Sequence, residues 1–534
     1  MEYLLAILLL TPLIFAVLAA WLPDGAGGRA MGLAGAILTS VVAAFVAVNY
    51  DWSAGGTQLA LTGWQLHTLG FGIKLGIDSI GVWLMLLTCL LHVVTALVNF
   101  RGIEKQAEAH SSWTLVMLFA LLGVWMARDL LLFYFFYELT LVPLFFLVGI
   151  WGQDERRAAA AKLFLYAFAG SVFTLAAFVY IGMSAGTFDI AGAIHHARQG
   201  FTENQRFWVL LGLLAGFLIK TPLFPLHTWL PQAHDQSNIA GGTDIGSMQL
   251  KIGAFGLLTI ALPIGMTDAA GNIVVFATDK LPFVETINIP LVLAVLALSA
   301  IIYGALVAWV QKDAKRVIAY STVSHLGFIV LGIVAATDLG LQSAVLYMLN
   351  TALATAAMFA MIGMVQLRLG TRTLESLSGL ARLMPTLAFF FVYFVMAGIG
   401  LPGFGPFISE FLTLMAAAQA THLGIGVAIV AGSGILLSAI YMLNLTARMM
   451  FGPVKLPAGV SRNQATDLNT REVTLLTLLA VPILLLGVLP SPVLKSVLPD
   501  VKALRSIQAS SPASGLPGPT LSASNNSEIS AEAR

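Results

Sequence analysis

Long apolar runs dominate this 534-residue chain and limit what it can fold into. A helix needs about 20 apolar residues to cross a bilayer, whereas the strands of a membrane β-barrel alternate in polarity over about ten residues. The chain lacks such alternating segments, and we expect an all-α polytopic membrane protein. Its apolar runs predict fourteen spans, near 3–22, 30–49, 75–98, 113–127, 130–151, 160–183, 207–227, 240–262, 289–310, 316–336, 341–367, 385–419, 422–450 and 473–493.

The shortage of charge excludes other classes of protein. Asp, Glu, Lys and Arg make up 10% of the residues, whereas soluble proteins carry roughly a quarter. A soluble enzyme, a disordered chain and a nucleic-acid-binding protein are excluded, because each needs many more charged side chains. The single cysteine, Cys89, excludes an internal disulfide, a thiolate zinc site and a four-cysteine iron–sulfur cluster. We expect Cys89 to be a small buried core residue.

Lys and Arg are distributed unequally between the two sides of the predicted bundle. Sixteen fall in loops after odd-numbered helices, and five fall in connections after even-numbered helices. Cytoplasmic loops carry the excess of positive charge, so the odd-numbered loops are expected in the cytoplasm and both termini outside. Residues 506–534 are rich in Ser, Ala, Pro and Gly, and a disordered tail is expected there.

Four charged side chains fall inside predicted spans, where a charge costs several kcal/mol unless it faces a polar interior. Lys220 and Lys251 are the basic residues that lie in no loop or tail, and Glu138 and Glu410 are the acids stranded in the same way. Such a carboxylate pairs with a cation or retains its proton, and either condition suits a residue that passes protons on. The alternatives are a snorkelling Lys220 and a structural ion pair.

Spacing and position add three further candidates. Asp244 lies seven residues before Lys251, so the two side chains share a helix face. Lys220 and His227 have the same spacing, although prolines intervene. His325 can titrate near neutral pH, and the alternative for it is a hydrogen-bonded core histidine.

Prolines and glycines interrupt two spans at membrane depth, near 220–225 and 401–406. Broken backbone at this depth is tolerated where it is buried or lines a wet cavity. These are the seventh and twelfth predicted helices, five apart, so helices 4–8 and 9–13 are expected to be two five-helix repeats with the broken helix in fourth place. Because each repeat has an odd number of helices, the two repeats have opposite orientations in the membrane. Gly398 to Gly403 fits GxGxxG but has no strand–turn–helix context, and we interpret it as the helix break.

These repeats set the expected domain organisation. The chain is expected to divide into N-terminal spans, a first repeat, an external loop, a second repeat, a cytoplasmic loop with the last span and the start of the tail, and the tail itself. The boundaries are 1–112, 113–262, 263–288, 289–450, 451–505 and 506–534.

Four motifs resemble the antiporter-like subunits of respiratory complex I. They are FYFFYELTLVPLFFLVGIWG from Phe133, KTPLFPLHTWLPQAH from Lys220, YSTVSHLGF from Tyr320 and GLPGFGPFISEF from Gly400. The resemblance covers roughly residues 70–455. The chain looks most like the M type (chain 4) of this family, which is related to subunits of photosynthetic NADH-dehydrogenase-like complexes and of Mrp-type cation/proton antiporters.

The resemblance implies roles for single residues. Glu138 matches the family's helix-five glutamate, and Lys220 matches its partner lysine on broken helix seven. Lys251 matches the central lysine of helix eight, and His325 matches the histidine of helix ten. Glu410 matches a helix-twelve position that is glutamate in the M type and usually lysine in the L and N types.

The chain also departs from the family pattern. Gln232 replaces an acid after the helix-seven motif, and residues 235–240 differ from the usual sequence. Thr351 stands where the family commonly has a histidine on helix eleven. Threonine can hold a water but cannot titrate, so this link would depend on water ordered by Thr351 or Asn350.

The resemblance implies a proton-translocating membrane subunit of an NADH–quinone oxidoreductase, driven by quinone reduction in other subunits. No cofactor, metal or redox centre is expected in this chain, and NADH, flavin, iron–sulfur clusters and quinone are expected in partner subunits. The expected partners are L-, N- and K-type membrane subunits and the lipid bilayer, without nucleic acid. The expected proton-pathway residues are Glu138, Lys220, Lys251, Glu410, His325, Asp244, His227 and Thr351.

Other assemblies use the same kind of subunit and stay open as alternatives. They are an Mrp-type Na⁺/H⁺ antiporter, an energy-converting hydrogenase and a bicarbonate-uptake complex. The expected location is an energy-coupling membrane, the bacterial cytoplasmic membrane, with both termini on the periplasmic side.

Overall fold

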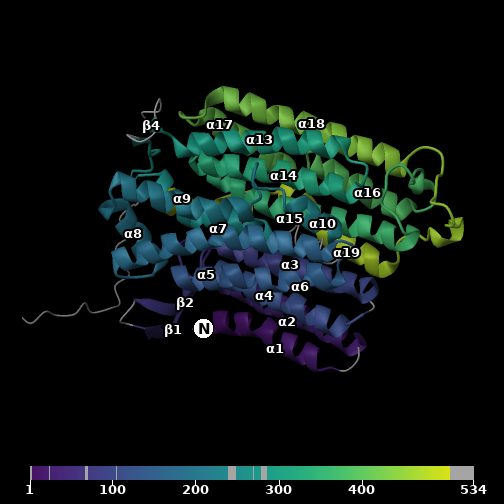
Figure 1. Ribbon diagram of the computed structural model, residues 1–534, viewed down its shortest axis with the longest axis horizontal. Coiled ribbons are helices and arrows are strands. Elements are labelled where there is room, and N and C mark those ends of the chain that lie inside the picture. The colour runs from purple at the N-terminus through teal and green to yellow at the C-terminus, as the bar shows by residue number, and fades with distance from the viewer. Residues whose placement is uncertain are drawn as a thin grey trace, which may run out of the picture.

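Helices lie side by side along the long axis of the molecule in the computed structural model, from α1 at one edge to α17 and α18 at the other (Figure 1). The structure describes residues 3–22, 25–66, 70–103, 105–238, 248–268, 270–277 and 286–505. Asp244 and the predicted tail 506–534 lie outside the described residues.

The first half of the chain holds α1 to η2 and one antiparallel hairpin. The helices are α1 Leu4–Trp21, α2 Gly25–Asn49, α3 Ser79–Gly102, α4 Ala107–Met126, α5 Leu130–Leu139, α6 Leu141–Trp151, α7 Arg156–Ala185, α8 Ile190–Gly200, α9 Glu203–Lys220, α10 Leu230–Gln236, α12 Lys251–Gly256 and the π-helix η2 Leu257–Met266. Strands β1 Gln58–Leu66 and β2 Phe71–Ile77 pair in an antiparallel register that runs from Gln58 opposite Ile77 to Leu66 opposite Phe71.

The second half begins with a short strand pair and continues in helices. The elements are β3 Phe276–Ala277, β4 Thr286–Ile287, α13 Ile289–Val310, α14 Ala314–Val334, α15 Asp338–Leu369, the 3₁₀ helix η3 Leu380–Arg382, α16 Pro385–Gly398, α17 Gly405–Gln419, α18 Gly424–Met450, the 3₁₀ helix η4 Arg462–Gln464, α19 Thr470–Val488 and α20 Ser491–Arg505.

The predicted all-helical membrane class is confirmed. Among the described residues, eleven helical segments are long and apolar enough to cross a membrane, if α5 and α6 count as one. The other three predicted spans, 207–227, 240–262 and 385–419, fall on interrupted or partly described helices, so the total of fourteen is not established. The outer helices expose large apolar side chains such as Phe173, Val310 and Ile425, as a lipid-facing surface requires.

Helices α14 and α15 form the centre of the molecule (Figure 1). The most apolar stretch of α15 is wholly buried, and α15 packs against α14, α16, α17, α19 and α20. Polar N-caps start several helices, as Asp129 does for α5, Asp313 for α14 and Thr337 for α15. Cys89 is buried in α3, as predicted.

Both predicted helix breaks are present. Helix α9 ends at Lys220 and α10 begins at Leu230, while α16 ends at Gly398 and α17 begins at Gly405. Prolines account for the first break, because they remove backbone donors and clash with the preceding turn.

Some elements differ from the sequence predictions. The predicted helix 130–151 is interrupted at Thr140, three residues before Pro143, whose missing N–H leaves the carbonyl of Leu139 without its helical donor. The hairpin β1–β2 and helices α8 and α20 were not predicted. Helix α20 packs on α3, α15 and η2, so its stability comes from contacts distant in sequence.

Candidate functional site

The first break holds a buried lysine against a tyrosine. Lys220 is 2% exposed and is the last residue of α9, where the negative end of the helix dipole favours a cation. Its Nζ donates to the carbonyl of Tyr137 and lies 3.6 Å from the centre of that ring. The Tyr137 phenol donates in turn to the carbonyl of Gly216 at 3.0 Å. These contacts tie α5 to the end of α9.

Glu138 follows Tyr137 and lies within electrostatic reach of Lys220. Its side chain is half-buried, and its Oε1 has no hydrogen-bond partner among the described residues. The structure therefore brings together Glu138 and Lys220, the pair that the sequence suggested.

Lys251 is fully buried and opens α12, beside the first break. Gly253 lets α12 approach the end of α9, because a Cβ at this position would collide with Thr221 Oγ1 and the carbonyl of Phe217. After Gly256 the helix widens into the π-helix η2, a conformation found frequently at functional sites. The predicted partner Asp244 lies outside the described residues.

His227 lies in the turns between α9 and α10 and is 3% exposed. Its ring packs against Phe224 and Tyr303, with ring centroids 5.8 and 5.2 Å away. Within the described part of the chain its Nδ1 has no partner, and no hydrogen bond joins it to Lys220. The structure thus buries His227 without linking it to the lysine seven residues earlier.

A second histidine near this break was missed by the sequence analysis. His234, on α10, is fully buried and stacks on Phe359 at 4.3 Å with an interplanar angle of 11°. Both ring nitrogens lack a partner within the described ranges. His234 lies within electrostatic reach of Lys251 and Lys315. The available signal was its place at the end of the KTPLFPLHTWLPQAH motif.

Charged side chains join the end of α10 to the start of α14. Asp235 pairs with Arg316 at 2.8 Å and also with Arg372, which pairs with Asp313 at 2.6 Å. Lys315, 4% exposed, donates to the carbonyl of Ser237 at 2.5 Å. The cluster connects the two halves of the chain close to His234.

The second break brings three side chains into one hydrogen-bonded row. Glu410 on α17 is 1% exposed, and its Oε1 accepts from the Tyr347 phenol at 2.6 Å. The same phenol oxygen lies 2.8 Å from His325 Nδ1. His325 is within electrostatic reach of Lys251. Tyr347 was missed by the sequence analysis, although it lies one helical turn before Thr351 on the same face of α15.

Thr351 lies beside this row without joining it. Its hydroxyl donates to the carbonyl of Tyr347 at 2.7 Å. Thr351 lines a cavity of about 20 Å³ together with Ser321, His325 and Tyr347, enough room for a single water. The neighbouring Asn350 donates to Ser409 at 2.9 Å. Thr351 is therefore next to the row but bonded to its own helix.

A larger cavity, of about 800 Å³, lies between the hairpin, α8, η2 and α20. Charged side chains line part of it, including Lys74, Arg128 and Asp500. Phe133 and Phe255 also line it, and their ring centroids are 6.4 Å apart at an angle of 25°. Phe255 is one helical turn beyond Lys251 on α12, so the wall of this cavity comes close to the buried lysine.

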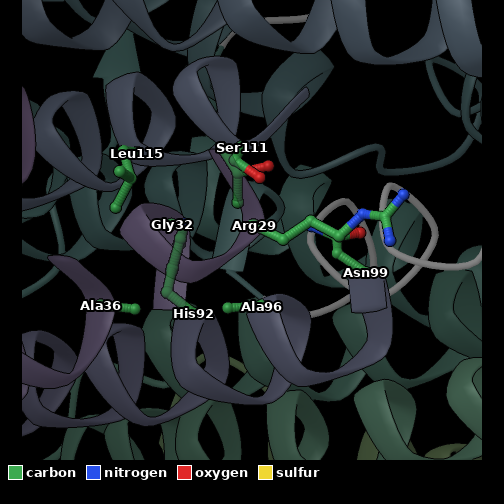
Figure 2. Close-up of a pocket in the computed structure, with 9 residues that line it drawn as sticks. Arg29, Gly32, Ala36, His92, Ala96, Asn99, Ser111 and Leu115 are labelled. Atoms are coloured by element: carbon green, nitrogen blue, oxygen red, sulfur yellow. The ribbon is translucent and has the colours of Figure 1, made fainter. Parts of the chain in front are cut away.

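Another small cavity, of about 10 Å³, lies among α2, α3 and α4 (Figure 2). Arg29, His92, Asn99 and Ser111 line it. His92 Nδ1 lies 2.8 Å from the carbonyl of Thr88. These polar groups are outside the predicted pathway. Among the residues the structure describes, no group of three or more His, Cys, Asp or Glu side chains could hold a metal ion.

Comparisons with known proteins identify similar chains. A family model described as "NADH:quinone oxidoreductase/Mrp antiporter, TM" matches residues 127–438. NADH-quinone oxidoreductase subunit M of Rhodobacter capsulatus is 35% identical over 520 residues, which cover 94% of this chain and 96% of that protein. NADH-ubiquinone oxidoreductase chain 4 of Chondrus crispus is 34% identical over 424 residues, which cover 79% of this chain and 81% of that protein.

Solved structures share the fold. A chain of respiratory complex I from Thermus thermophilus has a TM-score of 0.82 and 29% identity, covering 94% of this chain and 99% of that chain. A chain of the Mrp complex from Dietzia has a TM-score of 0.78 and 20% identity, covering 93% of this chain and 52% of that one. The second likeness concerns the fold alone.

Proposed function

We propose, from the premise that this chain belongs to the NADH:quinone oxidoreductase/Mrp antiporter family of membrane subunits, that it is the M-type subunit of an NADH–quinone oxidoreductase and translocates protons. The observation that carries the proposal is the set of ionisable side chains inside the bundle, all of them buried except the half-buried Glu138. Its members are Glu138, Lys220, Lys251, His234, His325 and Glu410. Charges at membrane depth are costly and mark ion and proton pathways.

The geometry supports proton transfer by buried bases. The Lys220 ammonium is held by one carbonyl and one aromatic face, and Glu138 is the nearby carboxylate. A buried ammonium is stable only while polar groups or a counter-charge remain close to it. Movement of Glu138 relative to Lys220 would make Lys220 release its proton towards Lys251, so a small displacement can drive transfer.

The energy for this displacement would come from quinone reduction in other subunits. NADH, flavin, iron–sulfur clusters and quinone would be bound by those partners, with L-, N- and K-type subunits beside this chain in the membrane. We place the chain in the bacterial cytoplasmic membrane with both termini periplasmic, from the 16-to-5 bias of Lys and Arg. The two repeats, 113–262 and 289–450, would each supply one half of the pathway, and Asp244, His227 and Thr351 would line it.

Glu138→Gln tests the proposal, because it removes the titratable group and keeps the shape of the side chain. We expect the intact complex to assemble and its proton pumping in vesicles to fall severely. Glu155→Gln is the matched control, since Glu155 is exposed at the start of α7. Full coupled pumping in the Glu138→Gln complex would contradict the proposal.

The sodium dependence of pumping separates this function from the Mrp-type alternative. Near full-length relatives named as oxidoreductase subunits favour the oxidoreductase subunit over the antiporter. We expect NADH-driven acidification of vesicles to persist in sodium-free medium. A strict requirement for sodium would favour the antiporter.

A further inference from the structure

The second repeat contains a gap between two titratable side chains. His325 Nδ1 and Glu410 Oε1 are 3.9 Å apart, beyond the distance of a hydrogen bond. The phenol oxygen of Tyr347 lies between them, 2.8 Å from the imidazole and 2.6 Å from the carboxylate. We infer that the Tyr347 phenol relays the proton between His325 and Glu410. This inference rests on the proposed function and adds a residue to its pathway.

The hydrogen bonds suit a relay from His325 to Glu410. The Tyr347 O–H donates to Glu410, so its lone pairs are free to accept the Nδ1–H of His325. In the relay step the N–H bond of a protonated His325 breaks and an O–H bond forms on Tyr347. The original Tyr347 O–H bond breaks, and that proton forms an O–H bond on Glu410. The tyrosine ends unchanged, and one proton has moved from the imidazole to the carboxylate.

Packing holds the relay in place. Tyr347 is fully buried in the first third of α15. The rings of His325 and Phe328 contact it edge-on, each with its centroid 6.0 Å away and at angles of 81° and 74°. A ring enclosed in this way keeps its phenol aimed at Glu410 without help from solvent.

The backbone at the break makes room for the receiving carboxylate. Gly400 has a φ of +71°, and a Cβ on it would collide with Glu410 Oε2. This Oε2 has no hydrogen-bond partner in the part of the chain that the structure describes. Glu410 can therefore take a proton on Oε1 from Tyr347 and keep Oε2 open for the next step.

Thr351 does not provide the same connection. Its hydroxyl donates to the carbonyl of Tyr347 at 2.7 Å and so is committed to its own helix. A water in the cavity of about 20 Å³ beside it would be a parallel route. The phenol needs no such water, because both of its hydrogen bonds are direct.

Tyr347→Phe removes the phenol oxygen and keeps the ring. In the intact complex in vesicles we expect a loss of proton pumping as large as that caused by Glu410→Gln. Tyr393→Phe is the matched control, because its phenol donates to a backbone carbonyl, that of Ala480, at 2.7 Å. The control is expected to pump at the rate of the unmodified complex. Unchanged pumping by Tyr347→Phe would overturn the inference.

A fluorinated tyrosine at position 347 supplies a second readout in a side chain of nearly the same shape. Fluorine makes the phenol a stronger hydrogen-bond donor and a weaker acceptor, so the rate of pumping at a fixed pH is expected to change. An unchanged rate would overturn the relay, since a purely structural tyrosine of nearly the same shape would leave the rate unchanged.

A separate Glu138→Gln complex, measured in the same vesicle assay, distinguishes failure of the relay from failure of the proposed function. If Glu138→Gln fails to pump while Tyr347→Phe pumps normally, only the relay is wrong. If both pump normally, the proposed function is wrong as well.

Discussion

The two broken helices hold their charges by different means. Lys220 ends α9 just before its break, and its contacts are a backbone carbonyl and the ring face of Tyr137. Glu410 lies in the second turn of α17, where the helix dipole is weak, and its contact is the phenol of Tyr347. A carbonyl and a ring face cannot pass a proton on, whereas a phenol can. In the proposed pathway, the first half would therefore have to move to transfer a proton, whereas the hydrogen bonds of the second half already connect His325 to Glu410.

Lys251 stands between these two regions, and its removal is expected to have the largest effect. Lys251→Ala leaves no titratable group at the start of α12 and should abolish pumping by the assembled complex. Lys251→Arg should do hardly better, because a guanidinium does not deprotonate at useful pH. Vesicle acidification with NADH measures both. Normal pumping by Lys251→Arg would mean that only the charge matters and that no proton passes through this residue.

Removal of the aromatic ring of Phe255, near Lys251, is expected to have the second-largest effect. Phe255 is 3% exposed, lines the cavity of about 800 Å³ and lies one helical turn beyond the lysine. We expect its ring to limit access from the cavity to the lysine, so vesicles of Phe255→Ala without NADH should leak protons faster. Phe255→Leu keeps an apolar plug and is the control. Equal passive leakage in Phe255→Ala and unmodified vesicles would show that the ring does not limit this access.

Alanine substitutions at two glycines of the second break separate an effect on Glu410 from an effect on the backbone alone. Gly400 and Gly403 have φ values of +71° and +102°, so an alanine at either costs roughly 1–2 kcal/mol of backbone strain. At Gly400 the added Cβ would also collide with Glu410, whereas at Gly403 it would meet nothing within 4 Å. We expect Gly400→Ala to lower pumping and Gly403→Ala to lower stability alone. Equal pumping by both variants would mean that Glu410 tolerates the displacement.

Local signals in the sequence predicted the spans and the breaks. Apolar length alone determines whether a helix can cross a bilayer, and prolines interrupt helices wherever they occur. The predictions for α13, α14 and α18 therefore lie close to the observed bounds. Helices α8 and α20 are less apolar, and α20 depends on distant contacts, such as that of Arg198 with the carbonyl of Leu504 at 2.6 Å.

The charged side chains were the most predictable part of the candidate site. Lys220, Lys251, Glu138 and Glu410 stand out because a charge in an apolar run is costly. Tyr347 does not stand out, since a tyrosine in an apolar run costs little. Its place between His325 and Glu410 depends on how α14, α15 and α17 pack, which no local pattern contains.

Substitution of Thr351 is expected to have the smallest effect on pumping. It tests whether the proton in the second half passes through water held by Thr351 or through the Tyr347 phenol. The sequence predicts that water held by Thr351 links the halves, whereas Tyr347 bridges His325 and Glu410 directly. Thr351→Val keeps the shape but frees the Tyr347 carbonyl from its hydrogen bond and makes the cavity of about 20 Å³ less polar. We expect pumping to fall measurably, by less than in Tyr347→Phe, and Thr351→His to be tolerated because an imidazole can titrate. Pumping in Thr351→Val as low as in Tyr347→Phe would mean that the water carries the proton and that the phenol only supports it.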